Sequence, residues 1–325
     1  DIDTLKKYQA EEEKMRGLSA TLVSIKELPA ETRDGKKVVL SANIEFPEEI
    51  PSVLQHGADG IGLYRTEYFY MNRRDLPTED EQYEAYRHLA QSFGSKHVIV
   101  RTLDLGGDKF ISQFNLPKEM SPFMGWRAIR FCLARPDVFK TQLRAILRAS
   151  AHGNLKIMFP MISGVEELRR AKMMLEESKE ELKAKKLAYN ADIHVGAMIE
   201  VPSAAMTSDI LAREVKFFSI GTNDLIQYAL AVDRTNEKIA YLYEPTHPAV
   251  LRLIKIVIEA GQRAHILVGM CGEMSGEPSL ALLLLGLGLD EFSMPSASIL
   301  EIKNVIRSVT YAQARQVAEE ALGLQ

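Results

Sequence analysis

Two carboxylates stand at the ends of apolar runs that follow one another along the chain. Glu200 ends "HVGAMIE" and Asp224 ends "FFSIGTND". If these runs are neighbouring parallel strands, their ends lie about 4.8 Å apart at one edge of the sheet. Mg²⁺ binds one or two carboxylates and completes its octahedron with water and substrate oxygens. The pair therefore predicts a Mg²⁺ site; the alternative is that each acid forms a structural ion pair with a nearby arginine.

Basic residues stand at similar places in the sequence. Arg65 and Arg101 end other apolar runs, Lys109 lies in "LGGDKF", Arg127 in "GWRAIR" and Arg234 in "AVDRTN". A guanidinium group can bind two oxygens of a carboxylate or phosphate at once. Several such groups at one site predict a ligand with more than one anionic group. For Arg127 the alternative is a solvated helix start, so Arg65 and Arg101 are the stronger candidates.

A cysteine lies between two glycines in "LVGMCGE", and the chain has only two cysteines. A thiol with an ordinary pKa near 8.5 is largely protonated at neutral pH and can act as a general acid toward an enolate. Nearby cations would instead favour the thiolate. A small buried apolar residue is an equally good interpretation of Cys271, and it is the favoured one for Cys132 in "RFCLAR".

The histidines are poorly placed for acid–base chemistry. His97, His194 and His265 stand at the starts of apolar runs, away from the ends that carry the charged residues. His247, between prolines in "EPTHPAV", is interpreted as a turn residue. The sequence also lacks a G-x-S-x-G nucleophile elbow and a P-loop. The candidate site is therefore a metal and anion site with a thiol at its edge.

The elements that must position these residues alternate regularly. We count eight short apolar runs, separated by amphipathic stretches, at 38–44, 60–66, 97–104, 156–162, 194–202, 217–224, 265–272 and 289–295. Alternating strands and helices are typical of parallel sheets, and eight such units favour a closed (β/α)8 barrel of ~250 residues. An open doubly wound sheet would carry a Gly-rich fingerprint after its first strand, where "SANIEFPEE" stands. In such barrels the active site lies at the carboxyl ends of the strands.

The domain prediction is a linker helix and turn at 1–35, followed by the barrel at 36–325 and a last helix at about 297–322. A net charge of −4, from 40 basic and 44 acidic residues, gives no reason to expect nucleic acid or an anionic membrane as partner. No apolar run is long enough to span a bilayer. Two cysteines and no signal peptide indicate a cytoplasmic protein. Because the chain begins with Asp1, we expect a processed protein or a fragment of a longer one.

Several segments of the sequence match the motifs of a known protein family. The chain resembles the enzyme I family of the bacterial phosphoenolpyruvate:sugar phosphotransferase system, from about residue 28 to the end. The segments that carry the resemblance are "GIGLYRTEYFYMNRRDLPTEDEQYEAY", "VIVRTLDLGGDK", "SPFMGWRAIR", "MIEVPSA", "FFSIGTNDLIQYALAVDR", "GMCGE" and "LGLGLDEFSM". The part covered is the phosphoenolpyruvate-binding domain, which in the family also forms the homodimer. Phosphoenolpyruvate synthases and pyruvate phosphate dikinases share this barrel and remain the alternative.

The resemblance implies a role for each candidate residue. Glu200 and Asp224 would bind Mg²⁺, and Cys271 would protonate the enolate of pyruvate. The residues that would bind phosphoenolpyruvate are Arg65, Arg101, Lys109, Arg127, Asn223, Asp224 and Arg234.

Two departures from the family pattern stand out. The motif like "TSHxAI", whose histidine accepts the phosphoryl group, is absent from this sequence. We therefore expect the chain to need a separate N-terminal domain, and through it the carrier protein HPr. A non-catalytic ligand-binding dimerisation module in isolation is a further alternative. In addition, Glu45 replaces a glycine that usually ends the first strand of the family.

Overall fold

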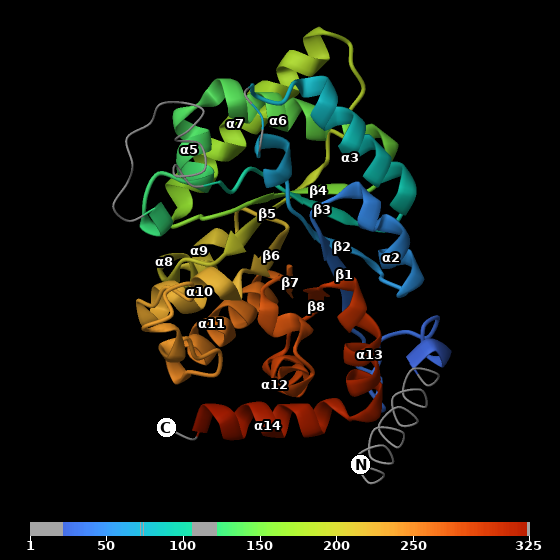
Figure 1. Ribbon diagram of the computed structural model, residues 1–325, viewed down its shortest axis with the longest axis vertical. Coiled ribbons are helices and arrows are strands. Elements are labelled where there is room, and N and C mark those ends of the chain that lie inside the picture. The colour runs from blue at the N-terminus through green and yellow to red at the C-terminus, as the bar shows by residue number, and fades with distance from the viewer. Residues whose placement is uncertain (1–21, 72, 74, 106–121, 324–325) are drawn as a thin grey trace, which may run out of the picture.

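Eight parallel strands form a closed barrel in sequence order, and β1 pairs with both β2 and β8 (Figure 1). This computed structural model describes residues 22–71, 73, 75–105 and 122–323. The strands are β1 (Val39–Ile44), β2 (Gly60–Tyr64), β3 (Val98–Arg101), β4 (Leu155–Phe159), β5 (His194–Ile199), β6 (Phe217–Ile220), β7 (Leu267–Met270) and β8 (Glu291–Met294). Seven lie within the predicted runs and β4 begins one residue before its run, so the barrel is confirmed and the open sheet is wrong.

Helices surround the barrel on the outside (Figure 1). Those before β5 are α2 (Ile50–Gln55), α3 (Glu79–Phe93), α5 (Ala128–Ala134), α6 (Pro136–Ala149) and α7 (Val165–Ala184). Those after β5 are α8 (Pro202–Met206), α9 (Ser208–Leu211), α10 (Thr222–Leu230), α11 (Pro248–Ala264), α12 (Pro278–Leu287), α13 (Ile299–Ser308) and α14 (Tyr311–Gly323). Short 3₁₀ turns include η1 (Pro47–Glu49), η2 (Glu67–Tyr70) and η6 (Glu273–Gly276).

The strands are short and apolar because both of their faces are covered. Every residue of β2, β6 and β8 is buried. The large core cluster joins the strands to the helices. A second, smaller cluster takes one residue from each of five strands and the residue that follows β7, and it consists of Leu63, Ile99, Met158, Met198, Phe217 and Cys271. Cys271 directly follows the last residue of β7 and thus lies at the end where the strands terminate.

The predicted last helix at 297–322 is wrong in one respect, since it is two helices. Val309 has an extended backbone (φ −123°, ψ 168°) and separates α13 from α14. Thr310 and Gln313 then form reciprocal side-chain to backbone hydrogen bonds, which favour a new helix start. The Asp34 carboxylate accepts hydrogen bonds from the first amides of α14, at Tyr311 and Ala312. Figure 1 shows α14 crossing beneath α12, against which it packs.

Two sequence predictions fall on residues outside the described ranges. Of the linker helix and turn predicted at 1–35, the described part has α-helical residues only at 22–24. Lys109 also lies outside the described residues. The boundary between linker and barrel at residue 35 therefore stays a prediction. Among the helices described, none has the length and apolarity needed to cross a membrane.

Candidate active site

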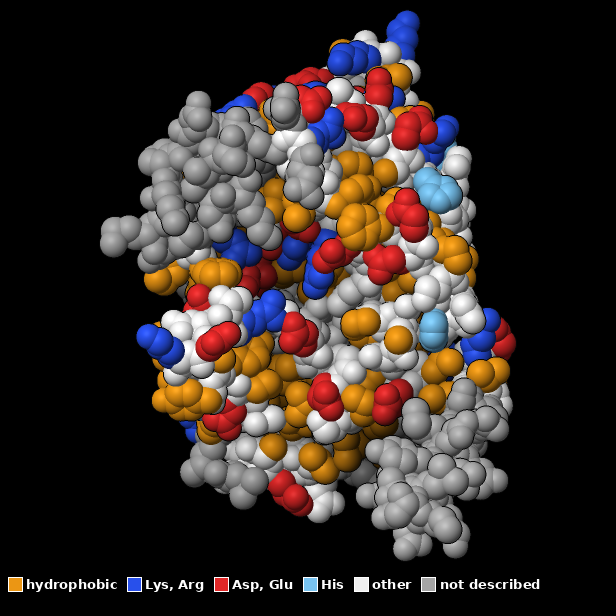
Figure 2. All heavy atoms as spheres, in the orientation of Figure 1, with side chains coloured by type: hydrophobic (Ala, Val, Ile, Leu, Met, Phe, Trp, Pro, Cys, Tyr) orange, Lys and Arg blue, Asp and Glu red, His pale blue; other side chains and the backbone are white. Residues whose placement is uncertain are grey.

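A cavity of about 500 Å³ opens at the carboxyl ends of the strands. Figure 2 shows acidic and basic side chains gathered in a hollow at the centre of the molecule's face. The predicted site residues that line the cavity are Arg65, Arg101, Arg127, Glu200, Asn223, Asp224, Arg234 and Cys271. The structure thus brings together every candidate that lies within the described residues. They come from five different strand ends, as expected for a barrel site.

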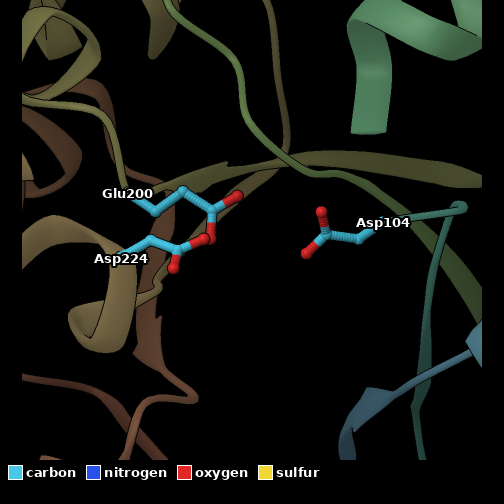
Figure 3. Close-up of side chains that lie close together, drawn as sticks. All are labelled: Asp104, Glu200 and Asp224. Atoms are coloured by element: carbon cyan, nitrogen blue, oxygen red, sulfur yellow. The ribbon is translucent and has the colours of Figure 1, made fainter. Parts of the chain in front are cut away.

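Three carboxylates converge in this cavity. One oxygen each of Asp104, Glu200 and Asp224 lies within 4.8 Å of the others. In Figure 3, Glu200 and Asp224 lie side by side, and Asp104 points toward them from the opposite side. Glu200 follows β5 directly, Asp224 lies in the first turn of α10 after β6, and Asp104 follows β3. An all-oxygen set of this kind suits a hard divalent cation better than zinc.

Glu200 is the buried member of the three, with 2% of its surface exposed. Burial, followed by the negative charges of Asp224 and Asp104, raises its pKa to about 8. One of its oxygens accepts a hydrogen bond of 2.5 Å from the backbone amide of Met161. Met161 has a left-handed backbone (φ 57°), which is uncommon for a side chain of its size. A divalent cation would relieve the repulsion among the three acids, so the residues present fit a metal ion.

Two arginines are held rigidly beside these acids. Arg101 forms ion pairs of 2.9 Å with Glu67 and 2.8 Å with Asp104. Arg127 forms ion pairs of 2.7 Å with Asp104 and 3.1 Å with Asp224. The buried Nε of Arg101 has no hydrogen-bond partner among the described residues. Part of the alternative interpretation therefore holds, because Asp224 does pair with an arginine, yet the cluster still offers donor and acceptor atoms to a ligand.

Two further arginines lie at the rim and are more exposed. Arg65 Nη1 is 2.5 Å from Glu45 Oε1, and Arg234 Nη1 is 2.5 Å from Glu273 Oε1. Asn223 is bound to the same glutamate: its Oδ1 accepts from the Glu273 amide and its Nδ2 donates to the Glu273 carboxylate. The rim therefore carries two salt bridges, one formed by residues that follow β1 and β2 and the other by residues that follow β6 and β7.

Cys271 follows β7 and lies almost fully buried at the floor of the cavity, with 5% of its surface exposed. Burial is the main cause that raises the pKa of its thiol to about 11. The positive charge of Arg101 opposes this shift but does not reverse it. The Asn43 side chain donates a hydrogen bond of 3.0 Å to the Cys271 carbonyl and so fixes its backbone. The thiol is accordingly held in its protonated form at neutral pH.

Two glycines allow the strand ends to approach so closely. A Cβ on Gly221 would lie 2.7 Å from Glu200 Oε2, and one on Gly272 would lie 1.8 Å from Thr222 Oγ1. The Thr222 side chain thus fills the space where a side chain at position 272 would lie.

Several site residues were not assigned a role from the sequence. Asp104, which follows Arg101 by three residues, was not predicted to join the carboxylate cluster. Glu67, Glu45 and Glu273 were missed as arginine partners. Their signal was weak, because an ion pair between residues distant in sequence leaves no spacing pattern.

Comparison with known proteins agrees with this geometry. The family model described as "PEP-utilising enzyme, PEP-binding domain" matches residues 19–311. The chain is 52% identical to the phosphoenolpyruvate-protein phosphotransferase of Priestia megaterium, over 95% of this chain and 54% of the relative. It is 49% identical to the proteins of the same name from Bacillus subtilis and Staphylococcus carnosus, over 99% and 98% of this chain. The chain spans little more than half the length of these relatives, 56% in both cases.

Solved structures share the fold at low sequence identity. A citrate lyase from Burkholderia xenovorans matches with a TM-score of 0.54 and 15% identity, covering 91% of this chain and 86% of that one. An aldolase/citrate lyase family protein from Burkholderia cenocepacia matches with a TM-score of 0.52 and 15% identity, covering 92% and 98%. At 15% identity, this structural similarity supports a shared barrel fold only. The sequence match, with its carboxylates, arginines and thiol at the strand ends, goes further, and the chain belongs to the PEP-binding domain family of PEP-utilising enzymes.

Proposed function

We propose that this chain binds phosphoenolpyruvate together with Mg²⁺ and supports transfer of its phosphoryl group to a histidine on a separate N-terminal domain. Pyruvate is the second product, and HPr receives the phosphoryl group from that histidine. The observation that carries the proposal is the convergence of three carboxylates, four arginines and one buried thiol on a single cavity. The similarity to phosphoenolpyruvate-protein phosphotransferases supports the same reaction.

The charge of the cavity supports a requirement for a cation. Its described lining carries four guanidinium groups and five carboxyl groups, those of Glu45, Glu67, Asp104, Glu200 and Asp224. Even with Glu200 protonated, this lining offers no excess positive charge to a multiply charged anion. Glu200 and Asp224 are the proposed Mg²⁺ ligands, and Asp104 lies near enough to join them. When bound, Mg²⁺ would offset the charge of the phosphate and stabilise the enolate oxygen.

The arginines bind and orient the substrate in this proposal. Phosphoryl transfer requires mainly positioning and charge stabilisation from the protein. Arg101 and Arg127 are fixed by buried carboxylates, so their remaining donors are preorganised. Arg65, Asn223 and Arg234 approach from the rim, and Lys109 is a further candidate that the described residues do not include.

The thiol completes the reaction. When the P–O bond breaks and a bond to the histidine nitrogen forms, the electron pair of the P–O bond stays on the oxygen and leaves an enolate. Cys271 then donates its S–H proton to the methylene carbon, which gives pyruvate, and the thiolate takes a proton back from water. A pKa raised to about 11 keeps the thiol protonated at neutral pH, as a proton donor requires.

Calorimetric titration of this chain with phosphoenolpyruvate tests the proposal. Binding is expected in the presence of Mg²⁺ and should be lost after chelation with EDTA. Arg101→Lys should weaken binding at least about tenfold, because a lysine cannot reproduce two fixed guanidinium pairs. Arg263→Lys, at an exposed position on α11, is the matched control and should bind normally. Absence of Mg²⁺-dependent binding in the wild-type chain would overturn the proposal.

Phosphohistidine formation separates this function from its alternatives. The barrel of a synthase or dikinase would serve a different N-terminal part, and a binding module would serve none. We therefore expect phosphorylation when the N-terminal domain of the phosphotransferase is added with phosphoenolpyruvate and Mg²⁺. A homodimer and a cytoplasmic location remain predictions of the same proposal.

A further inference from the structure

The four arginines of the cavity differ in how firmly their carboxylate partners hold them. The pairs of Arg101 and Arg127 are buried, with side chains no more than 15% exposed. The pair of Arg65 and Glu45 is 38% and 48% exposed. Separating a buried pair leaves an uncompensated charge, whereas an exposed pair contributes little to stability and is easily exchanged. Separating Glu45 from Arg65 therefore costs little free energy, and Arg65 can then bind a ligand.

Glu45 is presented to the cavity by a well-defined turn. Its backbone amide and that of Phe46 both donate to Glu49 Oε1, at 2.7 and 2.9 Å. The Phe46 ring packs against the Tyr68 ring, with centroids 5.3 Å apart. The turn follows β1 and Arg65 follows β2, which pairs with β1. The carboxylate is thus fixed by its own turn at the side of the cavity where Arg65 lies, and both residues line the cavity.

From this geometry we propose that Glu45 lowers the affinity of the site for its substrate, as an internal anion that pairs with Arg65 until an anionic group of the substrate displaces it. This inference rests on the proposed function, because it concerns the same ligand. A carboxylate beside Arg65 opposes the entry of any anion and must be outcompeted by a strongly charged one. Glu45 therefore weakens binding of phosphoenolpyruvate and helps the emptied site to return to its resting pairs.

The second rim pair is a less suitable test of this idea. Glu273 also binds Asn223 through both its amide and its carboxylate. Replacing Glu273 would disturb Asn223 as well as free Arg234. Glu45 offers a cleaner substitution, since its carboxylate has Arg65 as its ion-pair partner among the described residues and its backbone is held independently by Glu49.

The experiment is a calorimetric titration of the full chain with phosphoenolpyruvate at saturating Mg²⁺. Glu45→Gln should lower the dissociation constant roughly two- to fivefold, the range expected from the strength of an exposed ion pair. Glu48→Gln is the matched control. It removes the same charge from the same turn, where Glu48 is exposed and contacts no arginine among the described residues. Its dissociation constant should equal that of the wild type.

The outcomes separate this inference from the proposed function. If the wild type does not bind phosphoenolpyruvate, the proposed function fails first. If the wild type binds but Glu45→Gln binds equally or more weakly, Glu45 does not compete for Arg65 and the inference is wrong. If Glu48→Gln binds as tightly as Glu45→Gln, the gain comes from general charge reduction, which also overturns it. Retained thermal unfolding midpoints in both variants would verify that each is folded.

Discussion

Two buried glutamates, one at each end of the barrel, have opposite electrostatic environments. Glu200 lies at the carboxyl ends of the strands beside two other acids, and burial with their negative charge raises its pKa to about 8. Glu291 begins β8 at the other end. Burial alone would raise the pKa of Glu291, but His97 and Ser41 together lower it below the usual value. Its Oε1 is 2.7 Å from His97 Nε2 and 2.5 Å from Ser41 Oγ.

The completeness of pairing among buried polar groups distinguishes a structural cluster from one that can bind a ligand. In the cluster of Ser41, His97 and Glu291, Oε1 of Glu291 is hydrogen-bonded to both Ser41 and His97, and no fully buried side-chain nitrogen or oxygen of these three residues lacks a partner. The upper cluster has three acids that repel one another and an arginine Nε without a partner among the described residues. Buried polar groups cost stability unless they are paired, so incomplete pairing indicates a site that a ligand completes.

The largest expected difference between the two ends of the barrel concerns proton transfer. Cys271→Ala should bind phosphoenolpyruvate normally but lose Mg²⁺-dependent hydrogen exchange at the pyruvate methyl group by 10²–10⁴-fold, the usual contribution of a positioned acid–base group. His97→Gln should keep exchange within about twofold, although histidine is the commoner acid–base residue. Glutamine places an amide donor where His97 Nε2 lies. Nuclear magnetic resonance of pyruvate in deuterated water measures the exchange.

Each result of this pair has a definite meaning. Unchanged exchange in Cys271→Ala would refute the acid role of the thiol. A large loss in a folded His97→Gln would show that the lower cluster takes part in the chemistry, and the comparison would fail.

A second prediction exchanges charge for a neutral isostere at each end of the barrel. Glu200→Gln should weaken Mg²⁺-dependent binding of phosphoenolpyruvate at least about 100-fold, since even outer-shell substitutions at metal sites cost 10–100-fold. It should not lower the thermal unfolding midpoint, because glutamine keeps an acceptor for the Met161 amide and is neutral, as the protonated Glu200 mostly is at pH 7. Glu291→Gln should leave the dissociation constant within about twofold. Titration calorimetry and thermal unfolding of both variants provide the measurements, and equal binding by the two would contradict the assignment.

The fold and the location of the candidate site residues were largely predictable from the sequence, because both follow from position along a strand. Glu200 ends an apolar run and His97 begins one, and this alone placed them at opposite ends of the barrel. What could not be predicted is how charges pair. Glu45 pairs with Arg65, and Glu67 pairs with Arg101. Both pairs depend on side-chain positions that only the closed barrel fixes.

The break between α13 and α14 was missed for a similar reason. The periodicity of the segment continues across Val309, and the turn there is stabilised from a distant part of the chain. Asp34 binds the start of α14, and the Arg33 amide donates to the Val309 carbonyl. Local patterns do not contain such contacts.

A third prediction uses pH. Because the pKa of Glu200 is raised to about 8, this carboxyl group is mostly protonated in the free protein at pH 7, and a metal ion must displace the proton. Affinity for Mg²⁺ with oxalate, an enolate mimic with both carboxylates ionised in this range, should fall up to about tenfold per pH unit below pH 8. Calorimetry at pH 7 in two buffers of different ionisation enthalpy should detect proton release on binding. Glu200→Gln should abolish that release, and a wild type that releases no proton would refute the raised pKa.

The smallest effect is expected at the lower end, where the readout is stability. Glu291→Gln keeps an acceptor for Ser41 and His97 but loses the charge, so the free energy of unfolding at pH 7 should fall by about 1–2 kcal/mol. A carboxyl group with a lowered pKa stabilises the fold above its unfolded-state pKa, and this stabilisation is lost as the pH falls through the folded-state value. The difference between variant and wild type should therefore begin to shrink below pH 4.5, the ordinary value for a glutamate. Urea unfolding at pH 7 and pH 4 measures this. A difference that grows on acidification would mean that Glu291 is not held as a stabilised carboxylate, and that the lower cluster shares the incomplete pairing of the upper one.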